Sequence, residues 1–426
     1  MLIHVVRPGD SAYSIALEYG IPMSQLILDN GLEDFARLAV GQALVIQFPV
    51  QSHTVRPGET LSSIASAYGL TVDQLWRNNP ILGGGADIYP GETLVIAYDS
   101  QPEAALSVSG YAYPFIGPRL LRATVPYLTY LTPFTYGFTP RGELVELDDG
   151  ALLTAAAQGG AAALMHLSTL TESGGFSNEL AHIALTDGAV QNRLIDNLEA
   201  MLLQKGYRGL DVDFEYVLAA DAAAYAAFLG RLAERLNPLG LPVITALAPK
   251  ISADQQGALY EGHDFGAIGA AANQVFLMTY EWGYTYGPPM AVAPLPNVRQ
   301  VVEYALTEIP AEKIWLGVPL YGYDWPLPFV QGRTRAQSIS PQEAVARAVR
   351  YGVAIQYSEA SQAPWYRYTD AHGVSHEVWF EDARSIQAKL ALIPEYGLYG
   401  VGYWNLTRPF PQNWRVLNAL YQIRRP

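Results

Sequence analysis

Three carboxylic acids alternate along one short apolar segment of the chain. Residues 209–216 read Gly-Leu-Asp-Val-Asp-Phe-Glu-Tyr, and the acids are Asp211, Asp213 and Glu215. If this segment is a β-strand, successive side chains point to opposite faces, so the three acids share one face. The other face then carries Val212, Phe214 and Tyr216. The pattern predicts a strand with a row of carboxylates on one side and a surface that packs on outer helices on the other.

Crowding gives this row its chemistry. Neighbouring acids repel one another and lose hydration when buried, so the pKa of at least one of them should rise. A raised pKa is what a proton donor needs near neutral pH. Glu215 lies nearest the C-terminal end of the strand, and we predict it to be the donor. The alternative is a row neutralised by Lys or Arg from neighbouring strands, and only Arg208 lies close by in sequence.

The chain around the acidic strand alternates between apolar runs and amphipathic or Ala-rich runs. This alternation predicts an α/β fold, a (β/α)₈ TIM barrel over residues 105–426, although a doubly wound sheet can share it. In a barrel the chemistry lies at the C-terminal ends of the strands, where Glu215 falls. The long segment before the last strand predicts an inserted hairpin around residues 353–380. The strand candidates are residues 106–114, 127–138, 162–168, 210–216, 243–248, 275–282, 314–325 and 398–406.

The N-terminal part of the chain contains an internal repeat. The segment His-Val-Val-Arg-Pro-Gly-Asp-Ser at residues 4–11 returns as His-Thr-Val-Arg-Pro-Gly-Glu-Thr at residues 53–60. Each copy continues with a Pro-Gly turn signal, a Ser or Thr close to a helix start, and a Tyr-Gly pair where a helix can end. We predict two small βααβ units, over residues 2–48 and 52–98.

These two units resemble LysM modules. That resemblance implies that they bind the N-acetylglucosamine backbone of peptidoglycan or chitin. The alternative is a pair of structural domains without a ligand. Most repeated positions, such as His4 and Leu26, are expected to serve the core of each unit rather than the sugar.

The acidic strand resembles the D-x-x-D-x-D-x-E signature of family 18 glycoside hydrolases. Asp211, Asp213 and Glu215 match the last three acids, and Arg208 stands where the first acid is usual. Residues 278–282, Met-Thr-Tyr-Glu-Trp, resemble the family's M-x-Y-D segment with Glu in place of Asp. Trp404 matches the tryptophan that floors the sugar pocket. The resemblance covers residues 105–426.

The family resemblance implies a substrate-assisted, retaining mechanism, an exception to the usual two-carboxylate scheme. Glu215 would protonate the glycosidic oxygen, and the sugar's own 2-acetamido group would attack the anomeric carbon. Asp213 would orient the acetamide N–H, and Asp211 would share a proton with Asp213. Tyr280 would hydrogen-bond the acetamide oxygen. The reacting sugar must therefore carry a 2-acetamido group.

Aromatic residues, 12% of the chain, gather at the predicted strand ends, where they suit the C–H faces of sugar rings. We predict substrate contacts from Trp404, Glu281, Trp282, Tyr111 and Tyr136. For an aromatic residue other than Trp404, core packing is the competing interpretation.

Other catalytic patterns are missing from the sequence. It has no H-E-x-x-H, G-x-S-x-G or Walker motif, and its seven His lack metal-ligand spacing. We interpret His166 and His182 as structural residues, and we predict neither a metal nor a cofactor.

Composition limits the partners. The net charge of −14, from 26 basic and 40 acidic residues, disfavours nucleic acid and anionic membranes. Without cysteine there are no disulfides or thiolate metal sites. A folded pattern begins at Leu2, so we expect no signal peptide, and no apolar run is long enough for a transmembrane helix. We expect no obligate protein partner.

The combination of two LysM modules with this barrel resembles the spore cortex-lytic and germination glycosylases. Residues 207–216, 279–283, 288–294 and 378–382 carry the more detailed likeness. It implies an N-acetylglucosaminidase acting on cortex peptidoglycan, located in the spore cortex or coat or at the cell wall. The alternatives are a LysM-bearing chitinase and a non-catalytic glycan-binding protein, and the presence of Glu215 argues against the latter.

Overall fold

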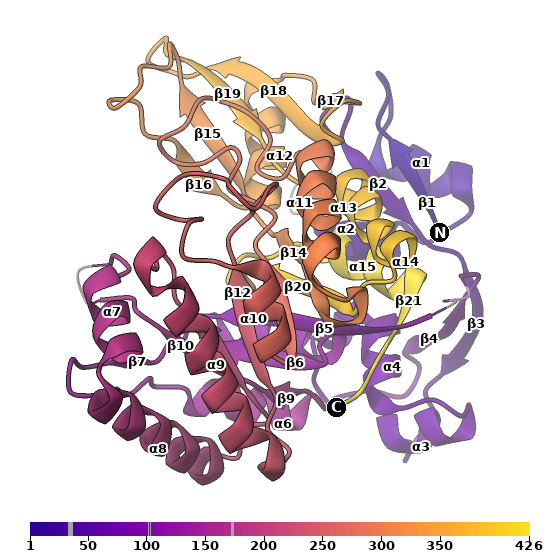
Figure 1. The fold of residues 1–426 in the computed structure, drawn as a ribbon. Coiled ribbons are helices and arrows are strands. Elements are labelled where there is room, and N and C mark those ends of the chain that lie inside the picture. Colours follow the sequence, from indigo (N-terminus) through magenta and orange to yellow (C-terminus); the bar gives the residue numbers. More distant parts are fainter. Residues whose placement is uncertain (33–36, 101, 103, 172–173) are drawn as a thin grey trace.

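The computed structural model describes residues 1–32, 37–100, 102, 104–171 and 174–426. The N-terminal units each form an antiparallel strand pair with two helices, at the indigo and violet end of the ribbon (Figure 1). Helices α1 and α3 both begin with a capping box, made by Ser11 and Ser14 and by Thr60 and Ser63. Their elements are β1 (Leu2–Val5), α1 (Ala12–Tyr19), α2 (Met23–Asn30), β2 (Ala43–Ile46), β3 (Pro49–Thr54), α3 (Leu61–Ala67), α4 (Val72–Asn78), η1 (Pro80–Leu82) and β4 (Thr93–Tyr98).

The repeat in the sequence becomes a repeat in hydrogen bonding. Asn30 ends α2, and its side-chain amide donates to the carbonyl of Val45 while its oxygen accepts from the Val45 N–H. Asn79 does the same with Val95 in the second unit. Each asparagine thereby ties the second helix to the closing strand, so the predicted βααβ units are confirmed.

The rest of the chain builds a near-closed parallel barrel, which confirms the predicted TIM-like α/β fold. The strand order runs from β10 through β11, β12, β13, β14, β20, β5 and β6 to β9, every pair parallel. Since β9 and β10 are successive pieces of one strand on either side of Leu164, the described residues give eight strands. They are β5 (Ala104–Ala112), β6 (Tyr130–Pro133), β9 (Ala162–Ala163), β10 (Met165–Ser168), β11 (Leu210–Asp213), β12 (Val243–Leu247), β13 (Gln274–Leu277), β14 (Ile314–Pro319) and β20 (Gly400–Trp404).

Helices surround the barrel and cover its apolar outer face (Figure 1). Glycine permits close packing inside: a Cβ on Gly402 would come within 2.2 Å of the Phe276 ring. Two helices follow one another over residues 178–205, since Asp187 ends the first and caps the second. The outer elements are α5 (Pro118–Thr124), α6 (Gly150–Gln158), α7 (Asn178–Thr186), α8 (Gly188–Lys205), α9 (Ala222–Leu236), α10 (Phe265–Ala271), α11 (Leu295–Glu308), α13 (Ala383–Leu390), α14 (Leu392–Tyr396) and α15 (Pro411–Leu420).

A second, antiparallel sheet is inserted between β14 and β20, at the top of Figure 1. The single strand expected over residues 314–325 is in fact two, because the chain leaves the barrel after Pro319 and enters the inserted sheet at Gly322. Residues 353–380 contain a strand pair of this sheet, joined by a turn at Asp370. Its elements are β15 (Gly322–Pro326), β16 (Gln337–Ile339), α12 (Pro341–Tyr351), β17 (Gln356–Ser358), β18 (Ala363–Thr369) and β19 (Ser375–Trp379).

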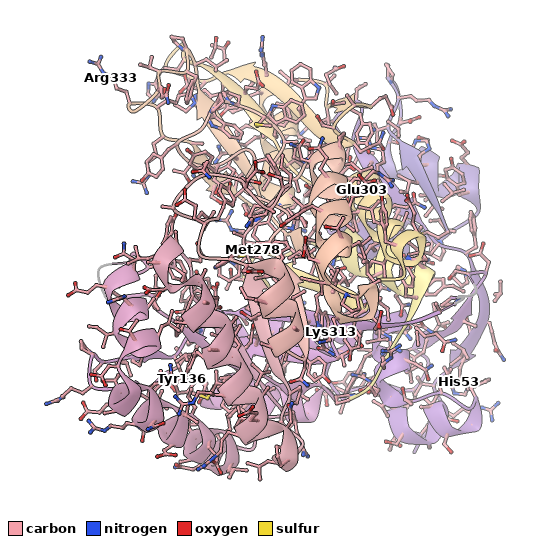
Figure 2. All side chains as sticks on the ribbon, viewed as in Figure 1. His53, Tyr136, Met278, Glu303, Lys313 and Arg333 are labelled. Atoms are coloured by element: carbon pink, nitrogen blue, oxygen red, sulfur yellow. The ribbon has the colours of Figure 1, made fainter. Side chains whose placement is uncertain are left out.

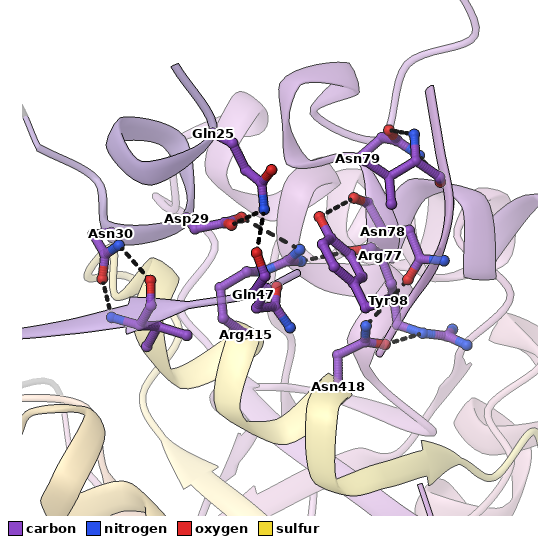
Figure 3. Close-up of polar contacts among 12 residues, drawn as sticks. Gln25, Asp29, Asn30, Gln47, Arg77, Asn78, Asn79, Tyr98, Arg415 and Asn418 are labelled. Atoms are coloured by element: carbon purple, nitrogen blue, oxygen red, sulfur yellow. Dashed lines mark hydrogen bonds and ion pairs between the residues drawn. The ribbon is translucent and has the colours of Figure 1, made fainter. Parts of the chain in front are cut away.

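Both N-terminal units dock on α15, the last helix of the chain (Figure 3). Arg415, buried on α15, lies 3.8 Å from Asp29 of the first unit and donates to the backbone carbonyl of Arg77 in the second. Asn418 accepts a hydrogen bond of 3.1 Å from Arg77. Burial raises the pKa of Asp29 to about 6, against the opposing charge of Arg415. The docked surface therefore includes a buried ion pair and is no flexible tether.

Candidate active site

The acidic strand β11 ends at Asp213, shorter than the strand predicted to reach Tyr216. Asp211 and Asp213 are buried, and Glu215 follows in the turn at the C-terminal end of the strand. Phe214 stacks on the opposite side with Phe228 of α9, at 5.8 Å between ring centroids. Tyr216 was expected on that packing side. Instead it has a positive φ of 58° and is exposed, because the strand has already ended.

Asp211 is held from across the barrel. Tyr111 on β5 donates a hydrogen bond of 2.7 Å to Asp211 Oδ2. Burial raises the pKa of Asp211, the nearby His166 and the Tyr111 hydroxyl lower it, and the charge of Asp213 raises it further. Oδ1 of Asp211 and Oδ1 of Asp213 are both buried without a hydrogen-bond partner in the described part of the chain. The charge of one acid therefore affects the ionisation of the other.

His166 on β10 belongs to this cluster, contrary to the structural role we predicted for it. Its Nε2 lies 3.6 Å from Asp213 Oδ2, and its Nδ1 is 2.6 Å from Thr135 Oγ1. In the parallel pair of β10 and β11, His166 stands opposite Asp211. In the sequence, His166 is only a polar residue within an apolar strand candidate. Its position beside the acids follows from the pairing of β10 with β11, which the sequence does not give.

Glu215 has the environment of a proton donor. Its pKa is raised well above the usual range, first by burial and then by the charges of Asp213 and Glu281. The side chain is partly exposed, and no described residue forms a hydrogen bond with its carboxyl group. The carboxyl group is therefore protonated at a pH where an ordinary glutamate is charged, and it is free to meet a ligand.

Tyr280 and Glu281 follow β13 at the same end of the barrel. Tyr280 is buried, and its pKa is raised well above the usual range by burial and by the charges of Asp213 and Glu215. Glu281 accepts hydrogen bonds from Tyr321 and, at 3.1 Å, from Tyr323. Burial raises the pKa of Glu281 despite these donors. Its φ of 66° is a strained value for a non-glycine residue, and such strain clusters at functional sites.

Aromatic rings line the barrel end beside the acids. Trp404, at the end of β20, is half-buried and lies 4.8 Å from Phe134 and 5.6 Å from Tyr111 between ring centroids. Trp282, also half-buried, is held by a backbone hydrogen bond of 3.0 Å to Val292. Tyr111 is buried and its hydroxyl donates to Asp211, so it helps to position the acid, and its contact with substrate stays a prediction.

Tyr136 lies elsewhere, which corrects the predicted set. It is fully buried, and its hydroxyl donates to Asp149 and accepts from Lys205 on α8 at 2.6 Å. Figure 2 labels Tyr136 well apart from Met278, which begins the segment of Tyr280. The aromatic residue at this strand end faces an outer helix, and periodicity alone could not tell that face from the mouth of the barrel.

The described residues contain no cluster of three or more His, Asp, Glu or Cys side chains that could hold a metal ion. His182 pairs with Asp221 at 2.8 Å, away from the acids. None of the helices in the described ranges is long and apolar enough to cross a membrane. The chemistry available at this site is therefore that of crowded carboxyl groups beside tyrosines and a tryptophan.

Comparison with known proteins matches both parts of the chain. The model of glycosyl hydrolases family 18 matches residues 128–408, and the LysM domain model matches residues 4–47 and 53–97. The chain is 43% identical over 426 residues to the cortical fragment-lytic enzyme of Bacillus subtilis (strain 168), with 99% of both chains covered.

Solved structures agree with these matches. The crystal structure of the Bacillus cereus spore cortex-lytic enzyme SleL has a TM-score of 0.84 at 38% identity, covering 99% of this chain and 98% of that chain. A chitinase from Chromobacterium violaceum has a TM-score of 0.68 at 26% identity, covering 74% of this chain and 98% of that chain.

Proposed function

Since the chain belongs to glycosyl hydrolase family 18 and carries two LysM domains, we propose that it is a retaining N-acetylglucosaminidase of spore cortex peptidoglycan. The observation that carries the proposal is Glu215. Its carboxyl group has a raised pKa, stands beside Asp213, and has no protein hydrogen-bond partner in the described ranges. A side chain kept protonated and unengaged at the end of a barrel strand is suited to protonating a leaving group.

The reaction begins with Glu215. Its proton passes to the glycosidic oxygen, and the bond from that oxygen to the anomeric carbon breaks. The carbonyl oxygen of the 2-acetamido group bonds to the same carbon, giving an oxazolinium ion. Asp213 accepts a hydrogen bond from the acetamide N–H and offsets the positive charge. Water then bonds to the anomeric carbon and gives its proton to Glu215, while the bond from that carbon to the acetamide oxygen breaks, which restores the 2-acetamido group and the original configuration.

The neighbours of these acids support this division of roles. Asp211 accepts a hydrogen bond from Tyr111. We propose that Asp211 and Asp213 share one proton, so that the pair carries one negative charge when the cation forms. Tyr280, buried beside Asp213 and Glu215, donates its hydroxyl to the acetamide oxygen and holds it for attack. Trp404 provides the floor under the reacting sugar, and Glu281 and Trp282 contact the sugar from the neighbouring segment.

The substrate follows from the relatives and the modules. The relative that is 43% identical over the whole chain is named a cortical fragment-lytic enzyme, and LysM modules suit N-acetylglucosamine polymers. We therefore assign the chain to cortex peptidoglycan, on fragments already released by another lytic enzyme, and to a place at the spore wall. Because both modules dock on α15, they hold the glycan at a fixed position relative to the barrel.

Cortex peptidoglycan fragments that another lytic enzyme has released test the proposal. They are incubated with the protein, and the products are reduced with borohydride and identified by mass spectrometry. We expect new reducing ends on N-acetylglucosamine, and none with Glu215→Gln. New reducing ends on muramic acid, or unchanged cleavage by the Glu215→Gln variant, would refute the proposal.

The likeness to the Chromobacterium violaceum chitinase favours chitin as the second candidate. The same preparation is therefore offered chitin oligomers. Cleavage of chitin with no cleavage of cortex fragments would replace the first candidate by the second.

A further inference from the structure

Phe115 is the most exposed large apolar side chain of the described residues, with 76% of its surface in contact with solvent. It follows β5, at the same end of the barrel as Glu215 and Trp404. A phenylalanine in this position adds nothing to the core. Exposed aromatic surface beside a catalytic site is instead a feature of binding surfaces.

A rigid turn presents Phe115. The N–H of Ile116 donates a hydrogen bond of 3.0 Å to the carbonyl of Tyr113, which closes a four-residue turn. Pro114 occupies the second position of this turn, where its fixed φ is preorganised. Ile116 is buried and anchors the far side of the turn before α5 begins at Pro118. The exposed ring is therefore held in place before any ligand arrives, which lowers the entropic cost of binding.

The ring of Phe115 continues the aromatic surface of the active site. It stacks on Tyr113 at 4.9 Å between centroids, with 19° between the ring planes. Tyr113 in turn lies 5.9 Å from Trp404 and 5.1 Å from Phe134. Phe115 thus stands one ring beyond Tyr113 on a continuous path that starts at the proposed floor of the reacting sugar.

We propose that Tyr113 and Phe115 form an outer subsite that binds the N-acetylhexosamine next to the reacting sugar in a glycan strand. The inference rests on the proposed function, because it takes Trp404 as the floor of the reacting subsite. The exposed ring of Phe115 and the half-exposed ring of Tyr113 together form an apolar face. Such a face matches the C–H face of an equatorially substituted pyranose. Phe115 has no polar group, so this subsite selects the length of the glycan and not its substituents.

The experiment compares glycans of different length. N-acetylglucosamine and chitotetraose are titrated calorimetrically into full-length Glu215→Gln protein, with and without Phe115→Ala. We expect Phe115→Ala to weaken chitotetraose binding about three- to tenfold, the range of one aromatic stacking contact, and to leave binding of the single sugar, which fills the reacting subsite alone, within about twofold. Phe115→Trp should retain or strengthen chitotetraose binding.

Leu203→Ala on α8 is the matched control, because Leu203 is also exposed, at 56%, and lies on an outer helix. It should change neither titration. Equal binding of chitotetraose with and without Phe115, or an equal loss for both sugars, would overturn the subsite.

These titrations require no cleavage, so they separate the two proposals. If the wild-type protein cleaves no N-acetylglucosamine polymer while Phe115→Ala still weakens chitotetraose binding, the proposed function fails and the subsite stands. If cleavage occurs and its kcat/KM on long oligomers is the same in Phe115→Ala, the subsite fails and the function stands.

Discussion

The Tyr111 hydroxyl reaches across the barrel from β5 and donates a 2.7 Å hydrogen bond to Asp211 on β11. These strands are separated by β6 and by the strand formed from β9 and β10, so the bond crosses the interior. A phenol that donates to a buried carboxylate favours its charged form. Tyr111 therefore helps to set the charge of the Asp211 and Asp213 pair.

Tyr111→Phe should move the acidic limb of the kcat/KM profile to higher pH. The hydrogen bond lowers the pKa of Asp211, so its loss lets burial raise that pKa further and the pair loses its negative charge sooner as pH falls. We therefore expect an upward shift of this limb. Tyr366→Phe is the control, because its buried hydroxyl donates to the Ala344 carbonyl within the inserted region. An unchanged profile in Tyr111→Phe would contradict the assignment.

His166→Asn should also move the acidic limb upward. The charge of His166 lowers the pKa of Asp211, so its removal lets that pKa rise further. His182→Asn removes a histidine that pairs with Asp221 and is not among the groups that shift the pKa of Asp211, so it should leave the profile as it is. If both variants gave the same profile, His166 would return to a purely structural role.

Glu215→Gln should be more stable than the wild type at neutral pH. The pKa of Glu215 is raised on folding, so the folded state binds its proton more tightly. The bound proton contributes fully to stability below the pKa of the unfolded state, about 4.5. This contribution is lost as the pH rises through the higher pKa of the folded state. Glutamine has no such loss. Thermal unfolding should show a higher Tm for Glu215→Gln at pH 7, and this difference should vanish near pH 4.

Glu234→Gln, an exposed acid on α9, is the control for this comparison and should show no such pH dependence. A wild type as stable as Glu215→Gln at both pH values would mean that the carboxyl group is hydrated in the folded protein.

Arg415→Met should destabilise the whole molecule by about 3–5 kcal/mol, because it leaves the buried Asp29 without its cation. Adding Asp29→Asn should restore part of this loss. Chemical denaturation measures both variants, and Arg193→Met, an exposed arginine on α8, is the control. Full stability of Arg415→Met would show that the modules are not coupled to the barrel through this helix.

The sequence predicted the elements that depend on local pattern. All eight barrel strands fall within or overlap their apolar runs, and the alternation of Asp211, Asp213 and Glu215 indicated their common side. Tertiary contacts decided the rest. The run over residues 314–325 is apolar apart from Asp324, so periodicity could not show that it leaves the barrel after Pro319.

The errors at the site have a similar origin. The position of His166 beside the acids depends on strand register, and the position of Tyr136 depends on the helix against which it packs. A single sequence gives neither the register nor the packing. The docking of Arg77 on Arg415 joins residues more than three hundred positions apart, and a local pattern carries no trace of it.

The order in which the chain is synthesised sets a limit on its assembly. The two modules leave the ribosome first, but α15, the helix on which they dock, is among the last segments made. The hydrogen bonds from Gln412 to Asn30 and from Arg415 to the Arg77 carbonyl, which join the modules to α15, can form only after α15 has been made. A product truncated before Pro411 would retain every barrel strand from β5 to β20, but both modules would lack the helix on which they dock. Correct placement of the first domains therefore depends on completion of translation.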